Sequence, residues 1–307
     1  MTVNEKKSCF EKAFEAIELD SDESANASTL AADICWTSKH LKWLIDTGER
    51  PITADGKVVE IWEFRYEADD AVLSAWAKHF RNHYCLDTEI DYYRRGYKYS
   101  RADYLNEIKF PDPQVAPGPS IRSGDFGETL VADFLEYILG YWVPRTRYAD
   151  KDIRNESSKG SDVIGFKFVA DGTESSDDML FIFEAKAQFS GSAPNPKLQE
   201  AIDHSQKDQR RKGESLNAIK QRLHEKGKED QAVLIERFQD PVGNPYVEYS
   251  GAAALFSTNL YTEQSIQSTH ADQHPNAANL KLIVIHGQEL MKLIHELYRR
   301  AADEAGN

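Results

Sequence analysis

Two acidic residues and a lysine are spaced in a way that suits metal-dependent chemistry. Asp162 follows a Gly-Ser pair at the start of an apolar segment, and Glu184 comes directly after the apolar run 179–183. Lys186 lies two positions beyond Glu184, so on a strand their side chains share one face, with Ala185 turned away. If the segment after Asp162 pairs with that run as a hairpin, two carboxylates and one ammonium group meet at one end of a sheet.

The chemistry that such a set supports is phosphodiester hydrolysis. A hard cation such as Mg²⁺ binds oxygen ligands, often one or two carboxylates together with waters and a substrate phosphate. It lowers the pKa of a bound water and stabilises the charge of the phosphoryl transition state. We expect Asp162 and Glu184 as ligands of Mg²⁺ or Mn²⁺, with the backbone carbonyl of Ala185 as an additional ligand. The ammonium group of Lys186 can orient the attacking water or hold the scissile phosphate.

Glu128 is a candidate for a third acid of the same site. It lies along the apolar stripe of a predicted helix, 125–139, and an inward-facing carboxylate needs a partner such as a metal ion. The same spacing also fits a helix N-terminus, with Asp125 as N-cap and Glu128 as its reciprocal capping partner. The remaining residues have structural interpretations too. Asp162 could be a turn residue that accepts backbone hydrogen bonds, and Glu184 and Lys186 could form an exposed ion pair at a strand end.

The segments around these residues predict a domain in which helices and strands are mixed. The run 179–183 is short and continuously apolar, which is typical of a strand buried on both faces. Gly213 separates two helical patterns. The predicted helices are 125–139, 196–212, 214–226 and 288–302, and the predicted strands are 163–169, 179–183, 251–257 and 280–285. This order predicts an α/β (α+β) fold with a mixed central sheet flanked by helices.

The N-terminal part predicts a smaller mixed α/β domain that could bind a partner. Its predicted elements are helices 4–19, 29–45 and 69–84, a polar loop 20–28 and a strand 58–66. The segment 110–120 contains four prolines and a glycine, which exclude regular structure and predict a linker. We therefore expect domains at 1–110 and 121–307, joined by a linker at 111–120.

Charge and composition bound the function further. The net charge of −14 argues against a chain that grips nucleic acid over a large surface by itself, because that affinity comes mainly from phosphate neutralisation. No apolar run approaches the ~18 residues of a membrane helix, and the first residues lack the apolar stretch and small-residue cleavage site expected of a signal peptide. The three cysteines, Cys9, Cys35 and Cys85, form no CxxC pair and predict neither disulfides nor a zinc knuckle. We expect a reduced cytoplasmic protein with no membrane contact.

Several basic and aromatic segments have two interpretations each. The charges at the end of helix 196–212 can compensate the helix dipole or contact phosphates beside the site; they are Lys207, Arg210 and Arg211. The segment before Asp162 can line a DNA path with Arg145, Arg147, Lys151, Arg154 and Lys159. The segment 91–101 interleaves tyrosines with basic residues, which suits base stacking but is more often a solvated surface. His79 and His83 share a helical face, but no carboxylate partner is evident in the sequence, which favours packing or surface roles.

At Glu128, Asp162 and the Glu-Ala-Lys tripeptide the sequence resembles the PD-(D/E)xK phosphodiesterase superfamily. Its pattern is a helix glutamate, an aspartate, and then (D/E)-x-K at the end of the next strand. The resemblance implies a restriction-endonuclease-like core in which the three acids bind metal and Lys186 is the catalytic lysine. Ser161 replaces the proline that gives the superfamily part of its name.

A narrower resemblance covers nearly the whole chain. It rests on segments 76–84, 110–112, 127–128, 160–162, 183–186 and 198–208. These are similar to the HamA family, the nuclease subunit of the bacterial Hachiman antiphage system. The resemblance implies a DNA-degrading subunit held by a superfamily 2 helicase, HamB, which would also explain how so acidic a chain reaches DNA. Two alternatives stay open: a catalytically inactive nuclease fold used for binding, and a restriction-type endonuclease that works alone.

Overall fold

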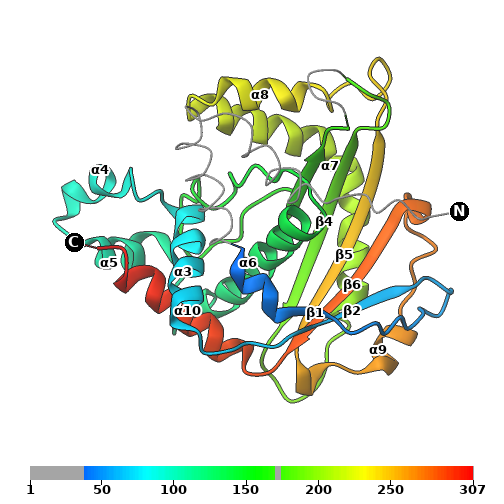
Figure 1. The fold of residues 1–307 in the computed structure, drawn as a ribbon, viewed down its shortest axis with the longest axis horizontal. Helices are drawn as coiled ribbons and strands as arrows, with labels where there is room; N and C mark the ends of the chain where they lie inside the picture. The colour runs from blue at the N-terminus through cyan, green and yellow to red at the C-terminus, as the bar shows by residue number, and fades with distance from the viewer. Residues whose placement is uncertain (1–37, 170–173, 307) are drawn as a thin grey trace, which may run out of the picture.

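The computed structural model describes residues 38–169 and 174–306. The predicted helix 4–19, the predicted loop 20–28 and residues 29–37 of the next predicted helix lie outside the described residues. In the described part, six strands form one mixed sheet with helices packed on both of its faces (Figure 1). This architecture confirms the predicted α/β class with a mixed central sheet flanked by helices.

The sheet has the strand order β1-β2-β6-β5-β4-β3. Its outer pairs, β1 with β2 and β3 with β4, are antiparallel, and the three inner pairings are parallel. The strands are β1 (Leu44–Asp46), β2 (Val59–Phe64), β3 (Val163–Lys167), β4 (Met179–Gln188), β5 (Val247–Ser257) and β6 (Leu280–Gly287). The predicted hairpin of the two strands around the candidate site is therefore confirmed as β3–β4.

The helices connect and cover these strands. The α-helices of the described residues are α3 (Asp70–Tyr84), α4 (Ile90–Arg94), α5 (Arg101–Tyr104), α6 (Gly118–Asp133), α7 (Lys197–Glu225), α8 (Glu229–Glu236), α9 (Glu263–Gln267) and α10 (Leu290–Asp303). Short 3-10 turns are η1 (Lys39–Trp43), η2 (Arg95–Tyr97), η5 (Thr258–Leu260) and η6 (Ala277–Asn279), and π-helical turns are η3 (Leu105–Lys109) and η4 (Phe134–Ile138). Residues 39–45, predicted as helix, instead form η1 and the start of β1.

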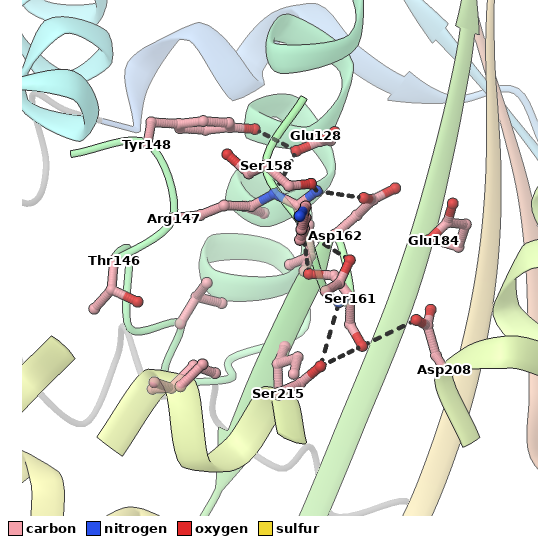
Figure 2. Close-up of a pocket in the computed structure, with 18 of the residues that line it drawn as sticks. Glu128, Thr146, Arg147, Tyr148, Ser158, Ser161, Asp162, Glu184, Asp208 and Ser215 are labelled. Atoms are coloured by element: carbon pink, nitrogen blue, oxygen red, sulfur yellow. Dashed lines mark hydrogen bonds and ion pairs between the residues drawn. The ribbon is translucent and has the colours of Figure 1, made fainter. Parts of the chain in front are cut away.

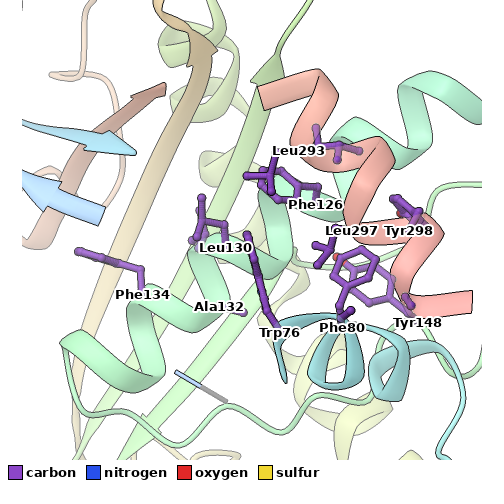
Figure 3. Packing of buried hydrophobic residues seen from close by; sticks show 14 of the residues in the cluster. Trp76, Phe80, Phe126, Leu130, Ala132, Phe134, Tyr148, Leu293, Leu297 and Tyr298 are labelled. Atoms are coloured by element: carbon purple, nitrogen blue, oxygen red, sulfur yellow. The ribbon is translucent and has the colours of Figure 1, made fainter. Parts of the chain in front are cut away.

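Strand β4 separates the two halves of the core. Its side chains alternate between faces, so Phe181 and Phe183 pack with α3, α6 and α10, while Leu180 and Ile182 pack with α7 and α8. Figure 3 shows the first of these clusters, where Trp76 of α3 lies between α6 and α10. Burial on both faces explains why the strand reads as a continuous apolar run.

Strand β5 lies against β4 through very small residues. Gly251 is the register partner of Phe183, and a Cβ atom at this glycine would come within 2.5 Å of the phenylalanine ring. Only a residue without a side chain leaves the ring this space. The small residues of β5 thus let the large side chains of β4 fill the core.

Helix α7 continues through the glycine at which a break was predicted. It is one helix of 29 residues, and Gly213 lies in its interior with nothing within 4 Å of a Cβ atom there. A helical glycine costs only about 1 kcal/mol, and both halves of α7 are fixed by buried apolar side chains, Leu198 in the first and Leu216 in the second. Tertiary packing therefore overrides the local break.

Helix α6 begins earlier than predicted. It starts at Gly118, inside the proline-rich segment, because proline is tolerated in the first turn of a helix. The prediction that 110–120 lacks regular structure is therefore wrong for its last residues. Glu128 lies in the helix interior as a result, so its interpretation as a capping residue at a helix start is wrong as well.

The N-terminal part shares the sheet and the core with the rest of the described chain. Strand β2 pairs with β6 in parallel, and α3 packs against α10 in the same hydrophobic cluster as α6. The division into domains at 111–120 stays a prediction. Among the described residues, none of the helices has the length and apolar character needed to cross a lipid bilayer.

Candidate metal-dependent active site

Strand β4 extends beyond its edge partner, and the candidate site lies at this open edge. The register of β3 begins at Val163, opposite Phe183, so the end of β4 passes the start of β3. Asp162 precedes β3 directly, and its Oδ2 accepts a hydrogen bond from the backbone N–H of Ala185 at 3.0 Å. Because the N–H and C=O of one strand residue point to the same side, the carbonyl of Ala185 faces this edge too. Asp162 therefore lies beside the Glu-Ala-Lys tripeptide.

Glu184 and Lys186 project together from β4 toward helix α7, as their spacing predicted. The ammonium group of Lys186 contacts Oε1 of Glu184, and Nδ1 of His204 lies 3.3 Å from the same oxygen. Burial, together with the nearby charge of Asp162, raises the pKa of Glu184 to about 9. The carboxylate is thus short of positive charge although Lys186 is next to it.

Glu128 reaches the same site from helix α6. Its Oε2 accepts a hydrogen bond from the hydroxyl of Tyr148 at 2.7 Å and lies 3.1 Å from Nε of Arg147. Arg147 also donates to Oδ1 of Asp162 at 2.9 Å, so one guanidinium joins two of the three predicted acids (Figure 2). Burial raises the pKa of Glu128 to about 8 even with this arginine beside it.

Arg147, one of the basic residues that could line a DNA path, is bound to groups of the chain itself. Its guanidinium turns inward and also donates to the carbonyls of Ser158 and Ser161. The other basic residues of this loop differ in environment. Three are paired with carboxylates of the chain itself: Arg145 with Asp133 and Glu136, Lys151 with Asp125, and Arg154 with Asp112.

Asp208 is a site residue that the sequence interpretation did not single out. It lies on α7 and is 4% exposed; its Oδ1 accepts from the hydroxyl of Ser161 at 3.0 Å, while Oδ2 has no hydrogen-bond partner among the described residues. Burial and the charge of Asp162 raise its pKa to about 6. The signal was present, because Asp208 continues the buried helical stripe of Ala201 and Ser205 at spacings of four and three.

These groups line one pocket of about 810 Å³ between β4, α6, α7 and the loop before β3. Its wall includes all four acids and, of the residues predicted to contact DNA, Lys159, Lys207 and Arg211. Arg210 is exposed on the same helix but is not part of the lining. The pocket therefore combines a carboxylate cluster with cationic groups on its wall.

The donor set fits a hard divalent cation. It offers carboxylate oxygens and a backbone carbonyl, which are the ligands that Mg²⁺ and Mn²⁺ prefer. Three of its acids have raised pKa values and one has an unsatisfied buried oxygen. A buried carboxylate without enough compensating charge is costly, and a bound cation removes that cost. Glu128, Asp162, Glu184 and Asp208 would hold such a metal.

Other groups considered in the sequence lie elsewhere. Tyr92, Tyr93 and Tyr97 of the segment 91–101 are exposed, and Cys85 is buried with a free thiol. Cys9 and Cys35 lie outside the described residues.

His79 and His83 do have a carboxylate partner, Asp133 of α6, which is distant in sequence and was not found there. The inference that they serve surface or packing roles rested on the lack of such a partner. Side chains that meet only through the tertiary fold escape a search by local spacing.

Comparison with known proteins places this site in a family context. The HamA family model matches residues 39–301, a stretch that contains all six described strands of the sheet and all four acids of the pocket. No curated protein matches the chain. The match covers well over half of the sequence, and the chain belongs to the HamA family, whose members are associated with Hachiman antiphage defence.

Proposed function

We propose that this chain is a Mg²⁺-dependent DNA nuclease of the PD-(D/E)xK superfamily, acting in the bacterial cytoplasm in Hachiman defence. The observation that supports it is the meeting of Asp162, Glu184 and Glu128 beside Lys186 in one pocket. These acids come from a loop, a strand and a helix that are far apart in sequence. Their common position is what hydrolysis of a phosphodiester with a divalent metal requires.

The roles follow from the contacts. Asp162, Glu184, Glu128, Asp208 and the carbonyl of Ala185 would hold Mg²⁺, which would supply an activated water and neutralise charge on the phosphate. Lys186 is fixed by its contact with Glu184, so its ammonium group can hold the attacking water or the scissile phosphate at a defined place.

Cationic groups on the pocket wall would guide the DNA backbone. Lys159, Lys207 and Arg211 line the pocket, and Arg210 extends the same helix face outward. With a net charge of −14, these few cations supply little long-range attraction for DNA. We propose that a HamB-like superfamily 2 helicase presents the DNA and holds the nuclease inactive until it is triggered.

Cleavage of linear and nicked DNA with Mg²⁺, by the chain alone and with the helicase, tests this function. Glu184→Ala and Lys186→Ala should abolish cleavage. The matched controls are Glu236→Ala and Lys220→Ala, which remove a surface ion pair of 2.7 Å on neighbouring helices and should cut like the wild type. Unchanged cleavage by the two pocket variants would exclude this assignment.

The alternative of a non-cutting binding subunit is favoured by one contact. Arg147 already places a positive charge between Glu128 and Asp162, as a metal ion would. Calorimetry distinguishes the two: no uptake of Mg²⁺ or Mn²⁺ by the complex would favour the binding subunit. Discrete cleavage bands from the isolated chain would instead indicate a stand-alone restriction-type enzyme.

A further inference from the structure

A second group of metal-binding side chains lies between α3 and α6. Nε2 of His79 is 3.0 Å from Oδ1 of Asp133 and 3.2 Å from Nε2 of His83. The three ligand atoms all lie within 4.8 Å of one another. None of them belongs to the acid cluster that we assign to Mg²⁺.

These separations match those of donor atoms around one ion. Ligands at 2.0–2.1 Å from a tetrahedral Zn²⁺ are about 3.3 Å apart. The two histidines stand one turn apart on α3, so their rings reach the same side of the helix, and the carboxylate comes from α6. Two imidazoles and one carboxylate are a donor set for a transition metal rather than for Mg²⁺.

The surroundings of the cluster are organised to orient these ligands. Oδ2 of Asp133, the oxygen not facing His79, is bonded to Nε2 of His40 at 2.8 Å. His40 in turn stacks on Trp76, with ring centroids 4.2 Å apart. Supporting hydrogen bonds of this kind fix ligating carboxylates in metal sites.

The local charge also favours a cation. With the histidines neutral, the cluster contains two carboxylates, Asp133 and Glu136, against one guanidinium, that of Arg145. The guanidinium of Arg145 forms an ion pair of 2.7 Å with Oδ1 of Asp133, and its Nη1 lies 3.4 Å from Nε2 of His83, so a positive group is already drawn to two of the three ligand atoms. The carboxylate oxygen has more than one lone pair, so it can keep this ion pair and still coordinate an ion.

An ion can reach the cluster from the active-site pocket. His83 and Arg145 are part of the pocket lining, whereas Asp133 is fully buried behind them. Three protein ligands would leave one coordination position for water on the pocket side.

We propose that His79, His83 and Asp133 form a transition-metal site, of the Zn²⁺ class, that joins α3 to the helix carrying Glu128. The ion would hold α3 against the wall of the active-site pocket. It is separate from the Mg²⁺ site and does not depend on the proposed cleavage activity.

Titration of the full chain with Co²⁺, followed by its visible absorption, tests this site. We expect one equivalent with the strong visible bands of a four-coordinate ion, in the wild type and in Glu184→Gln, whose change is confined to the Mg²⁺ site. His79→Gln and His83→Gln should each weaken Co²⁺ binding by more than about 100-fold, beyond what loss of a supporting hydrogen bond costs. His295→Gln, an exposed histidine of α10, is the matched control and should bind as the wild type does.

X-ray absorption of the Zn²⁺-loaded wild type adds a measurement that needs no variant to fold. Two imidazole nitrogens around the zinc support the proposal, and one or none overturns it. Absence of the visible bands in the wild type, or equal Co²⁺ affinity in folded His79→Gln and His83→Gln proteins, would overturn it as well. Absence of DNA cleavage by the wild type, with its Co²⁺ bands intact, would count against the nuclease function alone.

Discussion

The positive charge that compensates the acid cluster can come from the guanidinium of Arg147 or from a bound metal ion. Replacing Arg147 by methionine distinguishes these two sources. The substitution keeps an unbranched side chain of similar length and removes the guanidinium that faces Glu128 and Asp162. Both ion pairs lie in a poorly exposed environment, with side-chain exposures of 14% and below. The acids then depend on a bound metal ion for compensation.

The expected loss of stability follows from the burial of these pairs. Removing one partner of a buried ion pair costs about 3–5 kcal/mol, because the remaining charge is left without compensation. In a chain of this size that corresponds to a fall in Tm of roughly 10 °C without metal. Mg²⁺ at about 100 times its Kd should raise the free energy of unfolding by about 2.7 kcal/mol, because it binds the folded state alone. Mg²⁺ should also bind Arg147→Met more tightly, because no guanidinium competes for the acids.

Differential scanning fluorimetry of Arg147→Met in EDTA and in Mg²⁺ measures both effects. The matched control is Arg299→Met, which removes an exposed arginine paired with Glu296 and Asp303 and should change Tm little. The reasoning is refuted if Arg147→Met melts with the wild type in EDTA. It is refuted equally if Mg²⁺ raises the Tm of both proteins by the same amount.

Three further outcomes follow from the structure. Glu128 and Glu184 have folded pKa values of about 8 and about 9, above their unfolded value of 4.5, so the folded state holds extra protons between these values; the metal-free free energy of unfolding in urea should therefore fall as the pH rises from about 4.5 to about 9, and saturating Mg²⁺ should flatten that fall. Asp208→Asn keeps an oxygen for its serine partner and should leave the free energy of unfolding within about 1 kcal/mol of wild type while weakening Mn²⁺ binding in calorimetry; unaltered Mn²⁺ affinity would remove this residue from the ligand set. Gly251→Ala should lower the free energy of unfolding in urea by about 1–3 kcal/mol, because the new methyl group meets the ring of Phe183. Gly213→Ala, in the open middle of α7, should raise that free energy by about 0.5–1 kcal/mol. The opposite order would contradict the packing of β4 against β5.

Much of the candidate site could be predicted because its residues sit at fixed offsets on one hairpin. The alternation of a strand places Glu184 and Lys186 together, and the antiparallel register of β3 with β4 brings Asp162 beside them. The continuous apolar run of β4 likewise identified a central strand buried on both faces. These features depend on local geometry, which a sequence expresses directly.

The rest depends on contacts between distant segments. A DNA path was only one possible interpretation of Arg147, and only the folded loop shows that its guanidinium turns toward Glu128. Asp133 approaches His79 and His83 because α3 packs on α6, a helix pair that no local pattern identifies. Gly213 was taken as a helix break because propensity is local, whereas the burial that keeps α7 continuous is tertiary.

The hydrogen bond from the Ala185 backbone to Asp162 gives that carboxylate a second task. The bond lies where β4 extends beyond the start of β3, and it satisfies the backbone N–H of Ala185. That donor could otherwise pair with a strand of another chain. An inactive Asp162→Ala protein would therefore be ambiguous, since both chemistry and protection against aggregation would be lost together. Asp162→Asn retains a carbonyl oxygen able to accept the same bond, which makes it the variant with which loss of catalysis can be assigned on its own.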